Sequence, residues 1–178
     1  PMVAKKYRPG QFFRVQNFET LAPLIGDTRL RTEAMAMRCV GVDADQGHLS
    51  LMVMEQGTSS RLCATLRPQD PISLMGPTGV HARIAADGET VMVIGGQLAA
   101  AEVRTLGPAL RAEGNRVLYI ALFDTAEEIY GQTELENATD VIVWITASDN
   151  LVPISRPQDY SVQGDLLDRL TAYAKGEI

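Results

Sequence analysis

The sequence predicts an antiparallel β-barrel followed by an α/β domain with a parallel sheet, and two observations predict this fold class. The first half of the 178-residue chain contains short apolar runs separated by turn residues, which is typical of a barrel or sandwich. From Thr90 onward, apolar strand patterns alternate with helical ones, which indicates a parallel sheet with helices on its faces. We expect the barrel domain over residues 1–87 and the α/β domain over 88–178, with the boundary near Ala86–Glu89.

Apolar runs and turns alternate through the first half. The expected strands are Phe12–Val15, Met35–Val42, Leu49–Met54, Ile72–Met75 and Val80–Ile84. The expected turns, rich in glycine, proline and aspartate, are Pro9–Gly10, Asp43–Gly47, Arg67–Pro71 and Gly76–Gly79. A short helix is expected over Ser59–Thr65, because the hydroxyls just before it can cap its free N–H groups.

Strands and helices alternate through the second half. The expected strands are Val91–Ile94, Arg116–Leu122 and Asp140–Ile145, and the expected helices are Ala99–Glu113, Thr125–Glu136 and Gln163–Lys175. Gly114 and Asn115 supply the stop signal after the first of these helices.

Composition excludes several classes of function. The formal charge of −6 and the pI near 4.9 argue against nucleic acid as a partner, because binding phosphates requires a basic face. No apolar run approaches the roughly 20 residues that span a bilayer, and no signal peptide is evident, so the expected location is the cytoplasm. Cys39 and Cys63 are predicted to be buried thiols. His48 and His81 lie far apart, so no metal site is expected.

Two glycine turns before helices are the candidate binding elements. Gly95 and Gly96 join an apolar strand to a small-residue helix, the junction at which parallel sheets present nucleotide sites, although many α/β proteins share it without binding a dinucleotide. The second turn, Gly57-Thr58-Ser59-Ser60, offers hydroxyls and amides for a diphosphate, and an ordinary helix cap explains it equally well. No catalytic triad or carboxylate pair is evident, so a cofactor would have to carry any reaction.

The order of these motifs resembles the ferredoxin–NADP reductase superfamily, especially electron-transfer subunits of the dihydroorotate dehydrogenase and sulfide dehydrogenase type. The resemblance covers nearly the whole chain: P-G-Q-F, a strand, G-T-S-S before a short helix, L-R-P-x-D, G-P-x-G, and a strand-G-G-helix junction. It implies FAD diphosphate on Gly57, Thr58, Ser59 and Ser60. It also implies a nicotinamide nucleotide near Gly95 and Gly96, with Thr146–Asp149 at a later strand end.

Further positions bear on these cofactors. Asp124 ends the second strand of the α/β half, where a carboxylate accepts a ribose hydroxyl and repels a 2′-phosphate, which favours NAD over NADP. In place of the family's flavin-contacting motif stands Met35-Ala36-Met37-Arg38, which would put Arg38 at the flavin edge. Gly26–Arg31 looks like an insertion. Gln97 occupies the position of a third glycine, and the charge of Glu102 opposes a pyrophosphate.

Both ends of the chain differ from the family pattern, so we expect a piece of a longer polypeptide, truncated at its C-terminus. A barrel without its first strand exposes an edge, which predicts pairing with another chain or a homo-oligomer. The expected function is a flavin- and pyridine-nucleotide-dependent module that passes electrons between NAD(P)H and a partner redox centre, such as an iron–sulfur protein. The alternative is a degenerate reductase-fold domain that serves as a structural or docking module.

Overall fold

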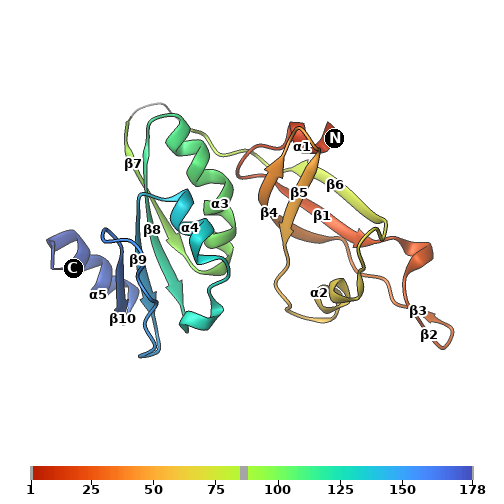
Figure 1. Ribbon diagram of the computed structural model, residues 1–178. Helices are drawn as coiled ribbons and strands as arrows, with labels where there is room; N and C mark the ends of the chain where they lie inside the picture. The colour runs from red at the N-terminus through yellow and green to blue at the C-terminus, as the bar shows by residue number, and fades with distance from the viewer. Residues whose placement is uncertain (1, 85–87, 178) are drawn as a thin grey trace. The chain divides into compact units, whose positions relative to one another are not determined.

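The computed structural model describes residues 2–84 and 88–177 and divides the chain into two compact units, Pro1–Ala82 and Arg83–Ile178 (Figure 1). Residues 85–87, on which the expected domain boundary falls, lie outside the described residues. No described helix is both long and apolar enough to cross a lipid bilayer.

An antiparallel sheet forms the first unit. Its strands are β1 (Phe12–Asn17), β4 (Met35–Asp43), β5 (His48–Met52) and β6 (Ile72–Thr78), in the order β5-β4-β1-β6. Alternate side chains point to one face, where Phe13, Val15, Met37 and Cys39 are buried together. The strands were predicted from short apolar runs between turn residues, and the structure shows that alternate residues of these runs are the buried ones.

Shorter elements complete this unit. They are α1 (Met2–Lys6), η1 (Glu19–Leu21), β2 (Leu24–Ile25), β3 (Thr28–Arg29), α2 (Thr58–Leu62) and η2 (Cys63–Thr65). Strands β2 and β3 form a small hairpin that projects from the four-stranded sheet in Figure 1, and this hairpin contains most of the segment interpreted as an insertion. The expected helix over Ser59–Thr65 is present as α2 followed by η2.

Three expectations for this unit were wrong. Val80–Ile84, all within the described residues, forms no strand, because Gly79 turns at a φ of 90° after β6 and the segment meets Pro9 through a bond from Ala82 N. Residues 76–78 of the expected Gly76–Gly79 turn continue β6, whose register with β1 shifts between the pairs Phe12–Thr78 and Arg14–Met75. Cys63 is only partly buried, whereas Cys39 is 1% exposed, and neither thiol is in a disulfide.

The second unit has a parallel sheet in the order β10-β9-β8-β7. Its strands are β7 (Thr90–Gly95), β8 (Arg116–Phe123), β9 (Val141–Thr146) and β10 (Tyr160–Gln163). Helices α3 (Gln97–Ala112) and α4 (Gln132–Ala138) cover one face, and α5 (Leu166–Lys175) covers the other (Figure 1). Because both faces are covered, β8 and β9 are apolar at almost every position. The predicted fold class, an antiparallel β-barrel domain followed by a parallel α/β domain, is confirmed as an antiparallel four-stranded sheet followed by a parallel four-stranded one.

Two elements of this unit differ from expectation. The predicted helix over Thr125–Glu136 is split into η3 (Ala126–Glu128) and α4, because Gly131 between them is left-handed at a φ of 64°. The last helix begins only at Leu166, where the carboxylate of Asp165 accepts a hydrogen bond from Leu167 N, and Gln163 belongs to β10. The stop at Gly114 is confirmed, since this residue has a φ of 83° and Asn115 N donates to Leu110 O.

Candidate functional site

The turn that follows β7 requires glycine at two consecutive positions. A Cβ atom on Gly95 would lie 2.9 Å from Ala99 Cβ, and Gly95 also has a φ of 149°. A Cβ atom on Gly96 would lie 2.6 Å from Leu122 O, a backbone atom of β8. The turn therefore packs directly on the neighbouring strand, and α3 begins at the next residue, Gln97.

The start of α3 leaves backbone donors available. The first N–H groups of a helix have no partner within the helix, and the helix dipole adds partial positive charge there. Gln97 is the first helical residue, so its own amide belongs to this set whatever its side chain does. The turn thus offers the backbone geometry that a phosphate group requires.

A buried tyrosine holds this turn from within the sheet. Tyr119 of β8 is fully buried, and its hydroxyl lies 2.9 Å from Gly95 O and 3.2 Å from Gly96 O. Burial raises the pKa of the Tyr119 phenol above its ordinary value, and the charge of Arg104 lowers it to a smaller extent, so this group is a hydrogen-bond donor at neutral pH. The sequence analysis missed Tyr119, because within an apolar strand it carries no signal that separates it from the core.

The carboxyl ends of β8 and β9 bring the other predicted residues of this unit together. Asp124 follows β8 and is exposed, and its carbonyl accepts a hydrogen bond of 3.0 Å from Ser148 N. Thr146 ends β9, paired with Phe123. Thr146 is fully buried, however, and its hydroxyl donates to Ser148 O at 3.1 Å. Its hydroxyl therefore stabilises the loop after β9.

Acidic side chains dominate the loop after β8. Glu127 lies one turn beyond Asp124, and its pKa is lowered by hydrogen bonds, first from its own backbone amide, then from the Thr125 hydroxyl and the Asn150 amide. Glu128 accepts a bond of 3.3 Å from Asp124 N. These carboxylates disfavour an additional phosphate at this edge of the sheet.

In the first unit, the turn before α2 is open on its outer side. Gly57 has a φ of 108°, which favours glycine, yet no atom lies within 4 Å of the position of a Cβ atom there. The Ser60 hydroxyl is buried and donates to Gly57 O at 3.1 Å, so it closes the turn from inside. Ser59 Oγ accepts a bond of 3.2 Å from Glu33 N and keeps its own proton for another acceptor, and Thr58 is exposed.

A reciprocal pair of polar side chains fixes the segment that reaches this turn. Asn17 N donates to Thr32 Oγ1 at 2.8 Å, and Thr32 N donates to Asn17 Oδ1 at 3.0 Å. Both residues are buried, and Asn17 Nδ2 also donates to Leu30 O. The backbone just before β4 is thereby held between the end of β1 and Ser59.

Arg38 lies elsewhere on the sheet. It pairs with Phe12 on β1 and with Met52 on β5, and its Nη1 atom is 3.5 Å from Gly10 O. The residue of this region that contacts the glycine turn is Glu33, five positions earlier. The structure thus joins Gly57, Ser59 and Ser60 to the segment before β4.

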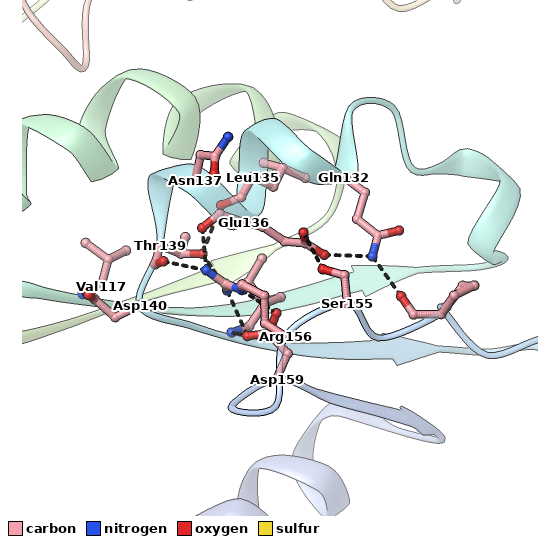
Figure 2. A network of polar contacts seen from close by, with 12 residues as sticks. Val117, Gln132, Leu135, Glu136, Asn137, Thr139, Asp140, Ser155, Arg156 and Asp159 are labelled. Atoms are coloured by element: carbon pink, nitrogen blue, oxygen red, sulfur yellow. Dashed lines mark hydrogen bonds and ion pairs between the residues drawn. The ribbon is translucent and has the colours of Figure 1, made fainter.

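A polar network centred on Arg156 fixes the long connection between β9 and β10 (Figure 2). The guanidinium group makes two bonds of 2.8 Å to the carboxylate of Asp159 and also donates to the carbonyls of Glu136 and Thr139 at the end of α4. Asp159 in turn accepts a bond of 2.8 Å from Ile142 N of β9. Nothing in the sequence pattern predicted this network, because its partners lie 3 to 20 positions apart.

The side chain of Glu136 extends the same network toward α4. Its carboxylate accepts bonds from Gln132 Nε2 at 2.8 Å and from Ser155 Oγ at 2.7 Å (Figure 2). The network therefore joins the end of α4, the start of β9 and the segment before β10, at the amino ends of these strands.

Comparison with known proteins identifies related chains. No protein-family model matches the chain. An uncharacterized protein of Rickettsia prowazekii (strain Madrid E) is 33% identical over 93 residues, which are 52% of this chain and 12% of that protein. The electron transfer subunit of dihydroorotate dehydrogenase B (NAD(+)) from Bacillus cereus (strain Q1) is 23% identical over 144 residues, which are 80% of this chain and 52% of that subunit. The chain thus spans about half the length of these subunits.

A solved structure decides the fold. The NADH-dependent reduced ferredoxin-NADP oxidoreductase, studied for flavin-based electron bifurcation, matches with a TM-score of 0.76 at 19% identity, over 98% of this chain and 56% of that chain. The chain has the ferredoxin–NADP reductase fold. The resemblance stated from the sequence is confirmed, and this reductase-fold chain is related to subunits of oxidoreductases.

Proposed function

We propose that this chain is a flavin- and pyridine-nucleotide-dependent electron-transfer module that passes electrons between NAD(P)H and a partner redox centre. The observation that carries the proposal is the turn at Gly95 and Gly96, which lies at the carboxyl end of a parallel strand and leads directly into α3, where the first backbone N–H groups are available. A turn at this place, in a chain related to electron-transfer subunits, supports nucleotide binding.

The first unit is proposed to hold FAD. The open space at Gly57, the exposed Thr58 and the free proton of Ser59 fit a diphosphate at the start of α2. Ser60 keeps the turn in shape through its bond to Gly57 O. When bound, FAD accepts a hydride and passes electrons on singly. We retain Arg38 as a proposed flavin-edge contact; its Nη1 atom lies 3.5 Å from Gly10 O, outside the turn.

The second unit is proposed to hold the nicotinamide nucleotide. The amides at Gly96 and at the start of α3 would bind its diphosphate, and the exposed carboxylate of Asp124 would accept a ribose hydroxyl. The negative charge after β8 favours NAD over NADP. Thr146 supports the site through its loop, because its hydroxyl is engaged by Ser148 O.

The proposed partner is an iron–sulfur redox centre or the remainder of a longer polypeptide. The curated relatives matched over 80% of this chain are named as electron transfer subunits, and each is about twice as long as the matched part. Strands β5 and β6 are the edges of the antiparallel sheet within the described residues, which supports the proposed pairing with another chain or another copy.

A second candidate function is a structural or docking domain that has kept the reductase fold without its cofactors. Two observations favour it: the hydroxyls of Ser60 and Thr146 are used inside the protein, and Arg38 contacts Gly10. The two functions differ in whether the purified chain retains flavin.

Flavin retention tests the proposal. The chain is incubated with excess FAD, freed of unbound flavin by gel filtration and examined by visible absorption, followed by addition of NADH under anaerobic conditions. Flavin bands that NADH bleaches support the reductase function. A folded, colourless protein favours the docking domain.

Matched variants locate the flavin. Ser59→Ala removes the hydroxyl that accepts a bond from Glu33 N beside the turn, and Thr171→Ala removes an exposed hydroxyl on α5. We expect FAD affinity to fall about tenfold in the first variant and to stay unchanged in the second. Equal retention by both variants contradicts the assignment of the diphosphate to this turn.

A further inference from the structure

We infer that Tyr119 is a positioning residue for the nucleotide turn, because its buried hydroxyl sets the direction of two backbone N–H groups. The inference rests on the proposed function of the turn and adds a residue that acts through the turn without touching the ligand. It accounts for a buried hydroxyl that the core itself does not require.

The position of Tyr119 in the sheet brings its hydroxyl to the turn. Tyr119 pairs in register with Val93, two residues before Gly95, on the face of the sheet that α3 covers. Its side chain extends toward the carboxyl end of β7, where the hydroxyl lies 2.9 Å from Gly95 O and 3.2 Å from Gly96 O. One proton is thus shared between two consecutive carbonyl groups.

Because the peptide bond is planar, the contact of Tyr119 with the two carbonyl groups also determines the direction of the N–H groups of Gly96 and Gln97. In a planar trans peptide unit, the C=O and N–H bonds point in opposite directions. Gly95 O shares its unit with Gly96 N, and Gly96 O shares its unit with Gln97 N. Because both carbonyls face the Tyr119 hydroxyl, both N–H groups point away from it, at the positively polarised start of α3.

Two adjacent glycines make such an anchor necessary. Glycine lacks the Cβ atom that restricts the backbone, so a two-glycine turn can rotate its peptide units at small energetic cost. Packing against Leu122 O excludes side chains at Gly96 but does not itself fix the direction of the N–H groups. The bond from Ala100 N to Gly96 O, 2.9 Å long, joins the turn to the helix, and Tyr119 joins it to the sheet.

The test is Tyr119→Phe in the full chain, titrated with ADP-ribose by calorimetry. We expect the affinity for ADP-ribose to fall about tenfold, because the diphosphate donors lose their fixed direction. All titrations are made at a temperature well below the midpoint of each variant's thermal unfolding, so that a loss of stability does not reduce the folded fraction. The control is Thr139→Val, which removes another buried hydroxyl of the same unit, one that donates to Leu135 O at 2.9 Å. Its affinity for ADP-ribose should stay unchanged.

Amide NMR spectra supply a readout that a purely structural role would not affect. In the wild-type chain, addition of ADP-ribose should shift the amide signals of Gly96 and Gln97. In Tyr119→Phe these shifts should shrink while the other signals of the unit keep their positions. If Tyr119→Phe does not fold, the wild-type spectra still decide, because binding that leaves both amides unshifted overturns the inference.

The outcomes separate this inference from the function on which it rests. A wild-type chain that does not bind ADP-ribose overturns the proposed nucleotide site and the role of Tyr119 with it. Binding that is equal in wild type and Tyr119→Phe overturns the role of Tyr119 alone. Equal weakening in Tyr119→Phe and Thr139→Val overturns it as well, since both variants would then act through stability.

Discussion

Replacing Gly107 by alanine has two opposite effects on the stability of the folded protein: it favours the helix, and it crowds the neighbouring helix. Gly107 is buried in α3, and a Cβ atom there would lie 2.1 Å from Ala138 O and 3.1 Å from Ala138 C. In an exposed helix, the same substitution stabilises by about 1 kcal/mol. Here the added methyl group meets the backbone of α4 at its last residue, so we expect a loss of stability.

The structure sets the size of this loss. The contact must lengthen by about 0.9 Å to reach 3.0 Å, the shortest distance that real Cβ atoms make. The end of α4 is held in place, because Arg156 donates to Glu136 O and Thr139 O, and Arg111 donates to Asn137 O at 2.7 Å. Overpacking a core costs about 1–3 kcal/mol, and a backbone contact belongs at the upper end. After the gain in helix propensity, the net loss is about 2 kcal/mol.

Urea unfolding followed by tryptophan fluorescence measures this loss. Trp144 is the only tryptophan of the chain and is fully buried in the core cluster that includes Ala138. Ala109→Gly, at a half-buried position of the same helix, is the control for propensity and should lose about 1 kcal/mol. A Gly107→Ala protein that unfolds at a higher urea concentration than wild type would refute the close packing of α3 on α4.

Three further predictions concern charged groups of the second unit. Asp159→Ala removes the carboxylate that holds Arg156 and Ile142 N, and it should destabilise the unit by about 3–5 kcal/mol in the same fluorescence assay; a loss below about 1 kcal/mol would contradict the network. Hydrogen bonds lower the pKa of Glu127, so its ionised carboxylate stabilises the folded protein above the ordinary pKa of 4.5, and this stabilisation is lost as the pH falls through the lower pKa of the folded state. Glu127→Gln should therefore flatten the dependence of the unfolding midpoint on pH in that acidic range. An unchanged pH profile would show that Glu127 does not cause the dependence. Asp124→Asn should improve the affinity for NADPH relative to NADH about fivefold at low salt, and an unchanged ratio would remove Asp124 from the ribose site.

The sequence predicted features that depend on neighbours along the chain. Short apolar runs between turn residues located four strands of the antiparallel sheet, and the apolar run before Gly95 located β7 and the turn that follows it. The end of α3 at Gly114 was predictable because glycine adopts the positive φ that ends the helix at little energetic cost. Val80–Ile84 looked like a strand because its composition is apolar, yet a strand also needs a partner, and the described residues give this segment only the single bond to Pro9.

The roles of polar side chains depended on contacts between distant residues and were not predictable in the same way. Ser60 was chosen for a hydroxyl that a diphosphate would use, and Thr146 for its place at a strand end, but the hydroxyls of both residues bond to the local backbone. Tyr119 looked like a core residue, but its hydroxyl contacts a turn 24 positions earlier in the chain. The role of a hydroxyl group depends on which acceptors lie near it in the folded structure, and the local sequence does not show this.

The two glycine turns also require glycine for different physical reasons. At Gly96 the neighbouring strand occupies the position of a Cβ atom, so packing of the sheet demands glycine even without a ligand. At Gly57 the position is open, and the demand comes from the backbone conformation at a φ of 108°. A motif at Gly95 and Gly96 is therefore weaker evidence for binding than its spacing suggests, because the fold alone would retain it. The bonds from the Tyr119 hydroxyl to Gly95 O and Gly96 O are a separate observation, because the packing of the glycines does not require them.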